Sequence, residues 1–164
     1  MVWAGICAHT IVGPYFFENE KVNGTTHLDM LQNLKIELAE SPVFAGHQMT
    51  LQQDGAPAHF SVQARTFLNE NFPGWIGRRG IVDWPPRSPD FTPCDFALWG
   101  ILKDRVFARR PRSIEFLKAV ITEELDVISD DKALLERICQ TVRKRCLECI
   151  DEDGGDIEHT PCIN

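Results

Sequence analysis

The chain has 164 residues, of which 43% are hydrophobic and 25% charged, and its formal net charge at pH 7 is −7. These values are typical of an ordinary soluble globular protein with one sizeable core. No apolar run approaches the roughly 20 residues that span a bilayer, and the first residues lack the basic start of a secretory signal, so we expect neither a membrane protein nor a secreted one. Six cysteines at irregular spacings are typical of reduced thiols and predict a nuclear or cytoplasmic location.

The N-terminal residues predict a β-hairpin followed by a helix. Apolar runs at 2–7 and 13–17 are separated by a small polar connection, so a turn is expected near 9–13. Leucines then recur at helical spacing, and either Thr25 or Thr26 can cap the helix that carries them. This stretch therefore predicts two strands and one helix.

The middle of the chain predicts strands that alternate with helices. Residues 48–54 predict a strand, 61–72 a helix, and 81–82 a short buried strand. Three prolines then stiffen the loop at 83–90, because each fixes its φ angle and removes a backbone donor. A further helix is expected from about 93 to 107.

Two more helices are expected at the end of the chain, one after Ser113 and one after Asp130 or Asp131. Strands come first, then strands with helices, then helices alone. This order predicts an α/β fold with a helical C-terminal tail.

Asp54 is the first candidate site residue. The predicted strand at 48–54 ends on this carboxylate, and Gly55, Pro57 and His59 follow at once. An ordinary turn would explain the Asp-Gly pair. A site at the carboxyl end of a strand would explain it too, because open α/β sheets place their ligands there.

Asp95 is the second candidate. Thr92 is a suitable N-cap, Pro93 suits the first helical position, and Asp95 falls at the third. A capping box would explain this carboxylate without any chemistry, since the helix dipole favours an acid at this end. The same geometry would also hold a carboxylate rigidly at a helix start, so both interpretations stay open.

The net charge of −7 is unfavourable for nucleic-acid binding, but the charges are uneven. Residues 76–112 carry eight Arg or Lys and four Asp, a local excess of +4. A surface that faces a polyanion and a solvated basic face explain this excess equally well.

Two motifs in order, LQQDGAPAH at 51–59 and VDWPPRSPDFTPCDFALWGILK at 82–103, resemble the catalytic domain of mariner-like DNA transposases. The stretch MVWAGICAHTIVGPYFFENEKVNG at 1–24 is similar to the hairpin that precedes the second acid of that family. The resemblance implies an RNase H-like mixed sheet flanked by helices. Residues 1–112 would form the catalytic core, without its first strand, and 113–164 a helical C-terminal extension of the same domain.

The resemblance also implies roles for the candidate residues. Asp54 matches the second metal-binding carboxylate of the family and Asp95 the third, so both would be catalytic metal ligands. His59 matches a histidine with a supporting role, and Asp90 a loop position with a capping or turn role. The implied cofactor is Mg²⁺ or Mn²⁺, because strand cleavage and transfer at phosphorus use hard cations held by carboxylates.

The implied partner is DNA, as transposon ends and target, and no small-molecule substrate is expected. The bases expected to face the DNA are Arg87, Lys103, Arg105, Arg109 and Arg110. A homodimer is possible. The alternative to an enzyme is a transposase-derived remnant that binds nucleic acid or protein without chemistry.

Two departures from the family pattern affect these expectations. Forty residues, 55 to 94, separate the two acids, which is more than in the best-known members. The first acid of the family would lie on a strand before the hairpin, and no residue of this chain matches it. We therefore expect the chain alone to be inactive and to bind a divalent cation weakly.

The C-terminal tail offers a third possibility. Cys146-x-x-Cys149 and His159-x-x-Cys162 have the ligand types of a tetrahedral zinc site. The first pair also fits a helix whose apolar face forms core, so a zinc site and a plain helix both stay open.

Overall fold

The computed structural model describes residues 1–18, 21–85 and 88–154. The chain forms two compact units. The first unit contains Met1 and Phe17–Ser88, and the second contains Val2–Phe16 and Pro89–Asn164. Asp54 belongs to the first unit and Asp95 to the second.

The second unit begins with the predicted hairpin. Strands β1 (Val2–Ile6) and β2 (Ile11–Phe16) pair antiparallel, with Trp3 opposite Tyr15. The turn occupies residues 7–10, earlier than the predicted 9–13, because β2 starts with two β-branched residues that suit a strand. The hairpin is therefore confirmed, and the position of its turn is corrected.

Helices make up the rest of this unit. They are a 3-10 turn η1 (Pro89–Phe91), a π-helical turn η2 (Cys94–Leu98), α3 (Trp99–Ala108), α4 (Ile114–Asp130) and α5 (Lys132–Asp151). The predicted caps at Ser113 and Asp131 are confirmed, since their side-chain oxygens accept the amide N–H three residues on. None of the described helices is long and apolar enough to cross a membrane.

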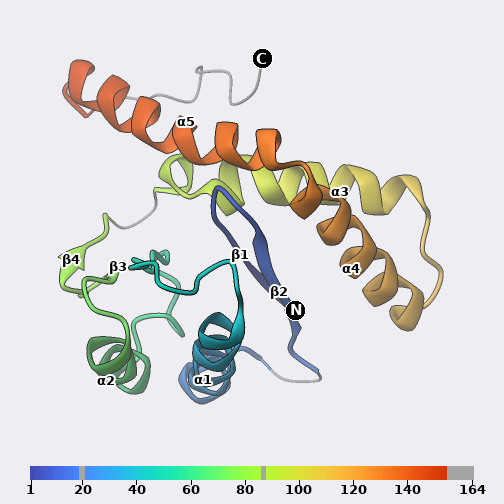
Figure 1. Cartoon of the computed structure of the whole chain (residues 1–164), viewed down its shortest axis with the longest axis horizontal. Helices are drawn as coiled ribbons and strands as arrows, with labels where there is room; N and C mark the ends of the chain where they lie inside the picture. The colour runs from blue at the N-terminus through green and yellow to red at the C-terminus, as the bar shows by residue number, and fades with distance from the viewer. Residues whose placement is uncertain (19–20, 86–87, 155–164) are drawn as a thin grey trace. The chain divides into compact units, whose positions relative to one another are not determined.

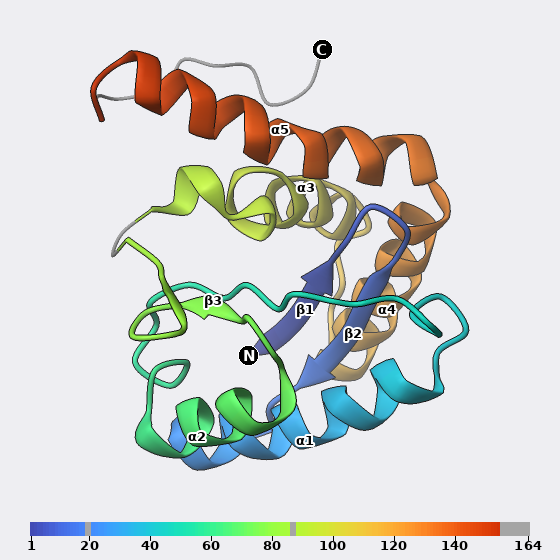
Figure 2. The ribbon, with the colours of Figure 1, turned by 60° about the vertical axis from the view of Figure 1, so that its left-hand side comes forward.

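The core of the second unit lies where α3, α4 and α5 meet the hairpin (Figures 1 and 2). Five of its side chains are completely buried: Leu98, Val120, Ile128, Leu135 and Ile138. They come from η2, α4 and α5, so the C-terminal helices supply most of the apolar interior. The hydroxyl of Ser129 on α4 also accepts the Ile11 amide of β2 at 3.1 Å.

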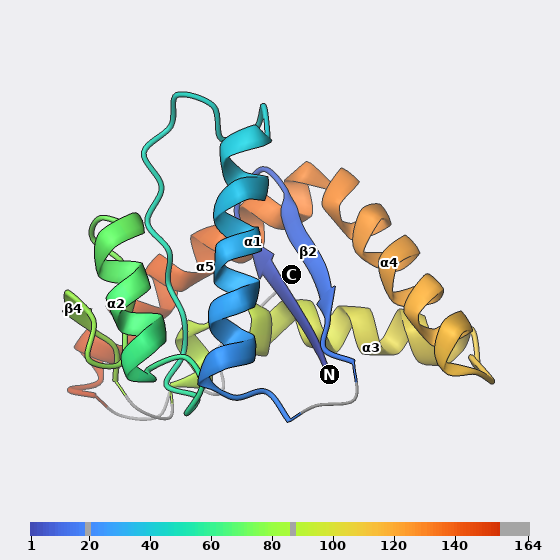
Figure 3. The same cartoon turned by 90° about the horizontal axis from the view of Figure 1, so that it is seen from below.

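Two helices lie side by side in the first unit, α1 (Gly24–Glu40) and α2 (Val62–Asn71) (Figure 3). Asn23 caps α1, and neither Thr25 nor Thr26 does, because the Asn23 carboxamide accepts the amides of both threonines. The predicted position of this cap was therefore two or three residues late.

The start of α1 approaches α2 closely. A Cβ added to Gly24 would lie 2.8 Å from the side chain of Ser61, the residue that caps α2. Further along, the Lys35 ammonium donates to the Asn71 side chain at 2.6 Å. The two helices therefore run parallel, and Gly24 permits their close start.

The sheet of the first unit is small. Strands β3 (Ile76–Gly77) and β4 (Val82–Asp83) pair in parallel, and Gln52 forms a single parallel bridge with Ile76. The predicted strand at 48–54 is thus reduced to one bridge, because β3, its partner among the described residues, is two residues long. The strand predicted at 81–82 is displaced by one residue and is exposed, not buried.

The indole of Trp75 fills the space beside β3. Its side chain is fully buried, and its Nε1 donates to the Asn69 carboxamide at 2.8 Å. A Cβ added to Gly77 would lie 2.5 Å from the Trp75 ring. The ring therefore requires glycine at this position.

We expect Gly77→Ala to lower the free energy of unfolding by about 2 kcal/mol, because overpacking forces a buried ring or the backbone to move. Urea denaturation measures this change. Gly100→Ala is the matched control, since an added Cβ on this helical residue meets nothing within 4 Å, and it should be neutral or slightly stabilising. Equal stability of wild type and Gly77→Ala would contradict the packing described for Trp75.

Candidate active site

Asp54 lies just after the bridge between Gln52 and Ile76. Its Oδ1 accepts the Ala56 amide at 3.0 Å and lies 2.5 Å from Nδ1 of His59. The His59 amide in turn donates to the Ala56 carbonyl at 2.9 Å, which closes the turn. The interpretation of the Asp-Gly pair as a turn is therefore confirmed, and this turn brings the imidazole to the carboxylate. The interpretation as a site stays a prediction.

His59 is also linked to two residues that the sequence did not single out. The Gln53 carboxamide donates to the His59 carbonyl at 2.9 Å and lies 3.2 Å, through its oxygen, from Nε2 of His27. The rings of His27 and His59 stack with centroids 4.4 Å apart. His27 is completely buried on α1. Gln53 and His27 therefore form a packed network with His59, the residue that contacts Asp54.

This network lowers the pKa of both Asp54 and His27, which favours the charged form of Asp54 and the neutral form of His27. The hydrogen bond from His59 lowers the pKa of Asp54 below its usual value, against the opposing effect of burial, and the Ala56 amide assists. Burial lowers the pKa of His27 to about 4, and the nearby His59 adds to this effect. Asp54 is therefore ionised and His27 neutral at neutral pH.

The chemistry of Asp54 fits a divalent cation as one ligand among several. Its side chain is 44% exposed and ionised, and both contacts recorded for it among the described residues use Oδ1. Carboxylate oxygen is the ligand that Mg²⁺ and Mn²⁺ prefer. Within the described ranges no group of three or more His, Cys, Asp or Glu side chains gathers to hold a metal.

Asp95 lies in the first turn of η2 and is exposed. The amides of Asp95 and Phe96 donate to the Thr92 carbonyl at 2.8 and 3.1 Å, so helical hydrogen bonding begins at Thr92, as predicted. A π-helical turn replaces the expected regular start. Coordination of one ion by Asp54 and Asp95 together stays a prediction.

A buried arginine holds the loop in front of Asp95. Arg145 on α5 is 3% exposed, and its guanidinium donates to the Asp90 carbonyl at 3.1 Å and lies 3.7 Å from the Asp90 carboxylate. The same guanidinium lies over the ring of Phe96 at 4.7 Å. Asp90 therefore has a structural role, consistent with the turn role expected for it.

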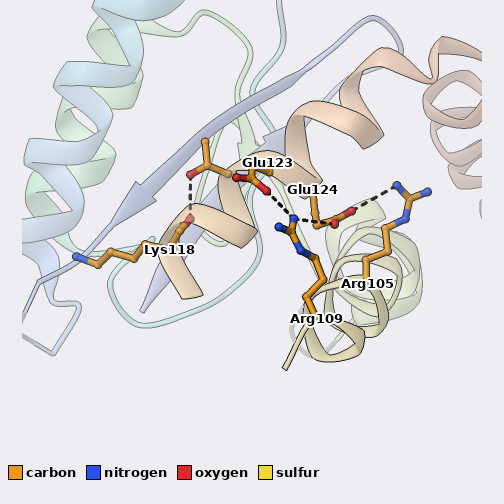
Figure 4. Close-up of polar contacts among 6 residues, drawn as sticks. Arg105, Arg109, Lys118, Glu123 and Glu124 are labelled. Carbon is orange, nitrogen blue, oxygen red and sulfur yellow. Dashed lines mark hydrogen bonds and ion pairs between the residues drawn. The ribbon is translucent and has the colours of Figure 1, made fainter. Parts of the chain in front are cut away.

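Two of the five bases expected to face DNA are engaged within the second unit. Arg109 on α3 pairs with Glu123 at 2.5 Å and with Glu124 at 3.4 Å, and Arg105 lies 3.9 Å from Glu124 (Figure 4). The two glutamates of α4 therefore compensate these charges locally.

The other three bases expected to face DNA are Arg87, Lys103 and Arg110. Lys103 and Arg110 are exposed. Arg87 lies outside the described residues. A role in DNA binding stays a prediction for all five bases.

The cysteines of the tail lie on a regular helix. Cys146 and Cys149 belong to α5 and are partly buried. Burial, with the neighbouring Cys149, raises the pKa of the Cys146 thiol, which disfavours the thiolate that binds zinc. His159 and Cys162 lie outside the described residues, so the zinc site stays a prediction.

Sequence reasoning missed His27, Gln53 and Arg145. His27 precedes Leu31 and Leu34 at helical spacing, so it takes the place of a core residue. Arg145 likewise lies seven residues after Ile138, on the buried face of α5. A polar residue on an apolar helix face was the available signal in both cases.

No protein-family model matches the chain. The chain is 26% identical over 161 residues to the Tcb2 transposase of Caenorhabditis briggsae, a match that covers 94% of this chain and 52% of that protein. The Mos1 transposase catalytic domain, solved with raltegravir and manganese, matches 96% of this chain and 82% of its own, with a TM-score of 0.79 and 19% identity. The Mos1 mariner paired-end complex with manganese covers 96% of this chain and 44% of its own, with a TM-score of 0.78 and 22% identity.

These similarities confirm the predicted fold class, an RNase H-like α/β fold with a helical C-terminal tail. The chain spans about half of the length of the Tcb2 transposase. The division of the chain at residue 112 is not tested by these matches and stays a prediction.

Proposed function

We propose that this chain, a mariner/Tc1-like transposase catalytic domain in sequence and fold, serves metal-dependent cleavage and transfer of DNA strands. The observation that carries the proposal is the state of Asp54. A hydrogen-bonded turn orients this carboxylate, His59 keeps it ionised, and close to half of its side chain is exposed. An ionised, oriented and accessible carboxylate is what a divalent cation requires.

Asp54 and Asp95 would be the ligands of Mg²⁺ or Mn²⁺. When bound, such ions supply stabilisation of the charge that builds on the attacking and leaving oxygens of a phosphodiester. His59 would act through Asp54, because its Nδ1 fixes Oδ1 and leaves the second oxygen for other ligands. The lowered pKa of Asp54 suits a ligand and not a proton donor.

DNA would be the macromolecular partner and the nucleus the place of action. The Mos1 mariner paired-end complex solved with manganese supports the metal, and the Mos1 paired-end complex solved with the left transposon end supports the DNA. Residues 113–164 would extend the catalytic core, and the contacts that α4 makes with β2 and α3 support this assignment. A homodimer is part of the same proposal.

We expect Mn²⁺ to broaden the amide signals of Gly55, Ala56 and His59 in a ¹⁵N-labelled sample of this chain, because a paramagnetic ion bound at Asp54 lies close to the turn. The dissociation constant should be on the order of 1 mM or weaker, since few carboxylates are available. Asp54→Asn should abolish the broadening, because the substitution removes the charge while keeping the shape.

Asp29→Asn is the matched control, since Asp29 is an exposed carboxylate on α1. It should leave the broadening unchanged. If the turn signals broaden equally in Asp54→Asn, the carboxylate is not a ligand. A calorimetric titration with tight binding of two ions would contradict the expectation that this chain lacks a ligand.

A further inference from the structure

Two adjacent arginines, Arg78 and Arg79, follow strand β3 in the first unit. The isolated parallel bridge between Gln52 and Ile76 brings the residues that follow Ile76 alongside those that follow Gln52. A Cβ added to Gly55 would lie 3.4 Å from Cδ of Arg78. The Arg78 side chain therefore passes directly over the residue that follows the carboxylate.

A single aromatic ring supports both guanidinium groups. The Cζ atom of Arg78 lies 4.2 Å from the centroid of the Phe60 ring, and that of Arg79 lies 5.8 Å from it. Stacking on a ring uses the flat face of a guanidinium and leaves its N–H donors, which lie in the plane, free to point outward. Phe60 thus orients the two cations without consuming their hydrogen bonds.

The backbone fixes the same arrangement. Arg79 has φ of 59°, and its amide donates to the Asp83 carboxylate at 2.7 Å. Asp83 therefore contacts the backbone of Arg79 through this bond. Arg79 is exposed and Arg78 partly so.

The charges of these two arginines are not compensated as those of α3 are. Over the described ranges, no ion pair joins Arg78 or Arg79 to a carboxylate. Arg105 and Arg109, by contrast, pair with Glu123 and Glu124. Arg78 and Arg79 therefore present two oriented cations to an outside anion.

We propose that Arg78 and Arg79, stacked on Phe60, bind the phosphates of a nucleic-acid strand next to Asp54. A planar guanidinium matches the two anionic oxygens of a phosphodiester, and adjacent arginines can follow a charged backbone. The partner is thus a sugar–phosphate chain, and the acidic residues of a protein are the competing ligand. This inference deepens the proposed function and rests on it for the choice of DNA.

The test is binding of this chain to a fluorescein-labelled DNA duplex, followed by anisotropy over a series of salt concentrations in EDTA. We expect Arg78→Gln/Arg79→Gln to weaken binding about tenfold or more at low salt. The slope of log affinity against log salt should fall in magnitude by about 2, since each phosphate contact contributes about 0.9. Arg78→Lys/Arg79→Lys should keep most of the slope but lose affinity, because lysine keeps the charge and lacks the planar fork. Circular dichroism confirms that each variant folds.

The matched control is Lys21→Gln/Arg143→Gln, which removes the same charge from exposed positions elsewhere. It should change the slope by less than about 0.5, because net charge acts weakly at a distance in salt. An equal loss in the two double variants, or no loss in Arg78→Gln/Arg79→Gln, would overturn the inference. So would failure of the wild-type chain to bind the duplex, or equal displacement of the DNA by polyglutamate.

The experiment separates this inference from the proposed function because it needs no metal. DNA binding that depends on Arg78 and Arg79, with no Mn²⁺ effect at Asp54, would support the arginine site and reject the metal site. An Mn²⁺ effect at Asp54 with unchanged DNA binding in the arginine variants would do the reverse.

Discussion

We expect Asp54→Asn to lower DNA strand cleavage by about three orders of magnitude in a transposase that uses this chain as its catalytic domain. Asparagine has the same shape and keeps an oxygen for the Ala56 amide, so the turn survives. The substitution removes the negative charge that would hold a cation, and loss of one preorganised electrostatic group costs about 10²–10³ in rate or more. Asp95→Asn should have a similar effect.

The measurement is the initial rate of strand cleavage on a duplex that carries the ends of the element, resolved on a denaturing gel. Asp29→Asn should cleave at the wild-type rate, since this carboxylate is exposed on α1 far along the chain from either motif. Urea denaturation of each variant separates a chemical defect from a folding defect. Cleavage by Asp54→Asn within tenfold of wild type would remove Asp54 from the active site.

We expect acidification from pH 7 to pH 5 to lower the free energy of unfolding by about 2 kcal/mol through His27. The pKa of this buried imidazole is lowered from 6.5 to about 4. Between these values the unfolded chain binds a proton at His27 and the folded chain does not. The contribution of His27 to stability is therefore fully present above the pKa of the unfolded chain and is lost as the pH falls toward the pKa of the folded chain. The loss reaches about 3 kcal/mol at pH 4.

The measurement is urea denaturation of wild type and His27→Gln at pH 7, 6 and 5. The variant should be less stable at pH 7, because the stacking on His59 is lost, but its stability should fall less with pH. His47→Gln is the matched control, since His47 is exposed, and it should keep the wild-type slope. Parallel pH curves for wild type and His27→Gln would show that His27 titrates normally and is not buried as described.

Local signals explain which elements the sequence could predict. The helix that begins after Ser61 and the two that begin after Ser113 and Asp131 each have a capping side chain next to an apolar pattern, and all three start where expected. The strand at 48–54 failed because strand formation depends on a partner distant in sequence. The short β3, next to Trp75, offers that segment one bridge.

Only those parts of the candidate site that lie close together in the sequence could be predicted. His59 could be assigned a supporting role because it lies five residues after Asp54 and in the same motif. His27 comes from another helix and has the spacing of a core leucine, so nothing in the sequence joined it to Asp54. Arg78 was visible as one base among eight, and only the folded chain, through the bridge between Gln52 and Ile76, brings it to Gly55, the residue after the carboxylate.

Arg145 on α5 contacts Asp90, so the final described helix helps to hold the segment that leads to Asp95. Arg145 lies 50 residues beyond Asp95, outside both motifs. A truncation of α5, or a frameshift that spares both aspartates, would release the loop that leads into η2. Preservation of the two acidic motifs in a related gene copy is therefore not enough to infer an intact catalytic domain, and the buried arginine of the last helix should be checked as well.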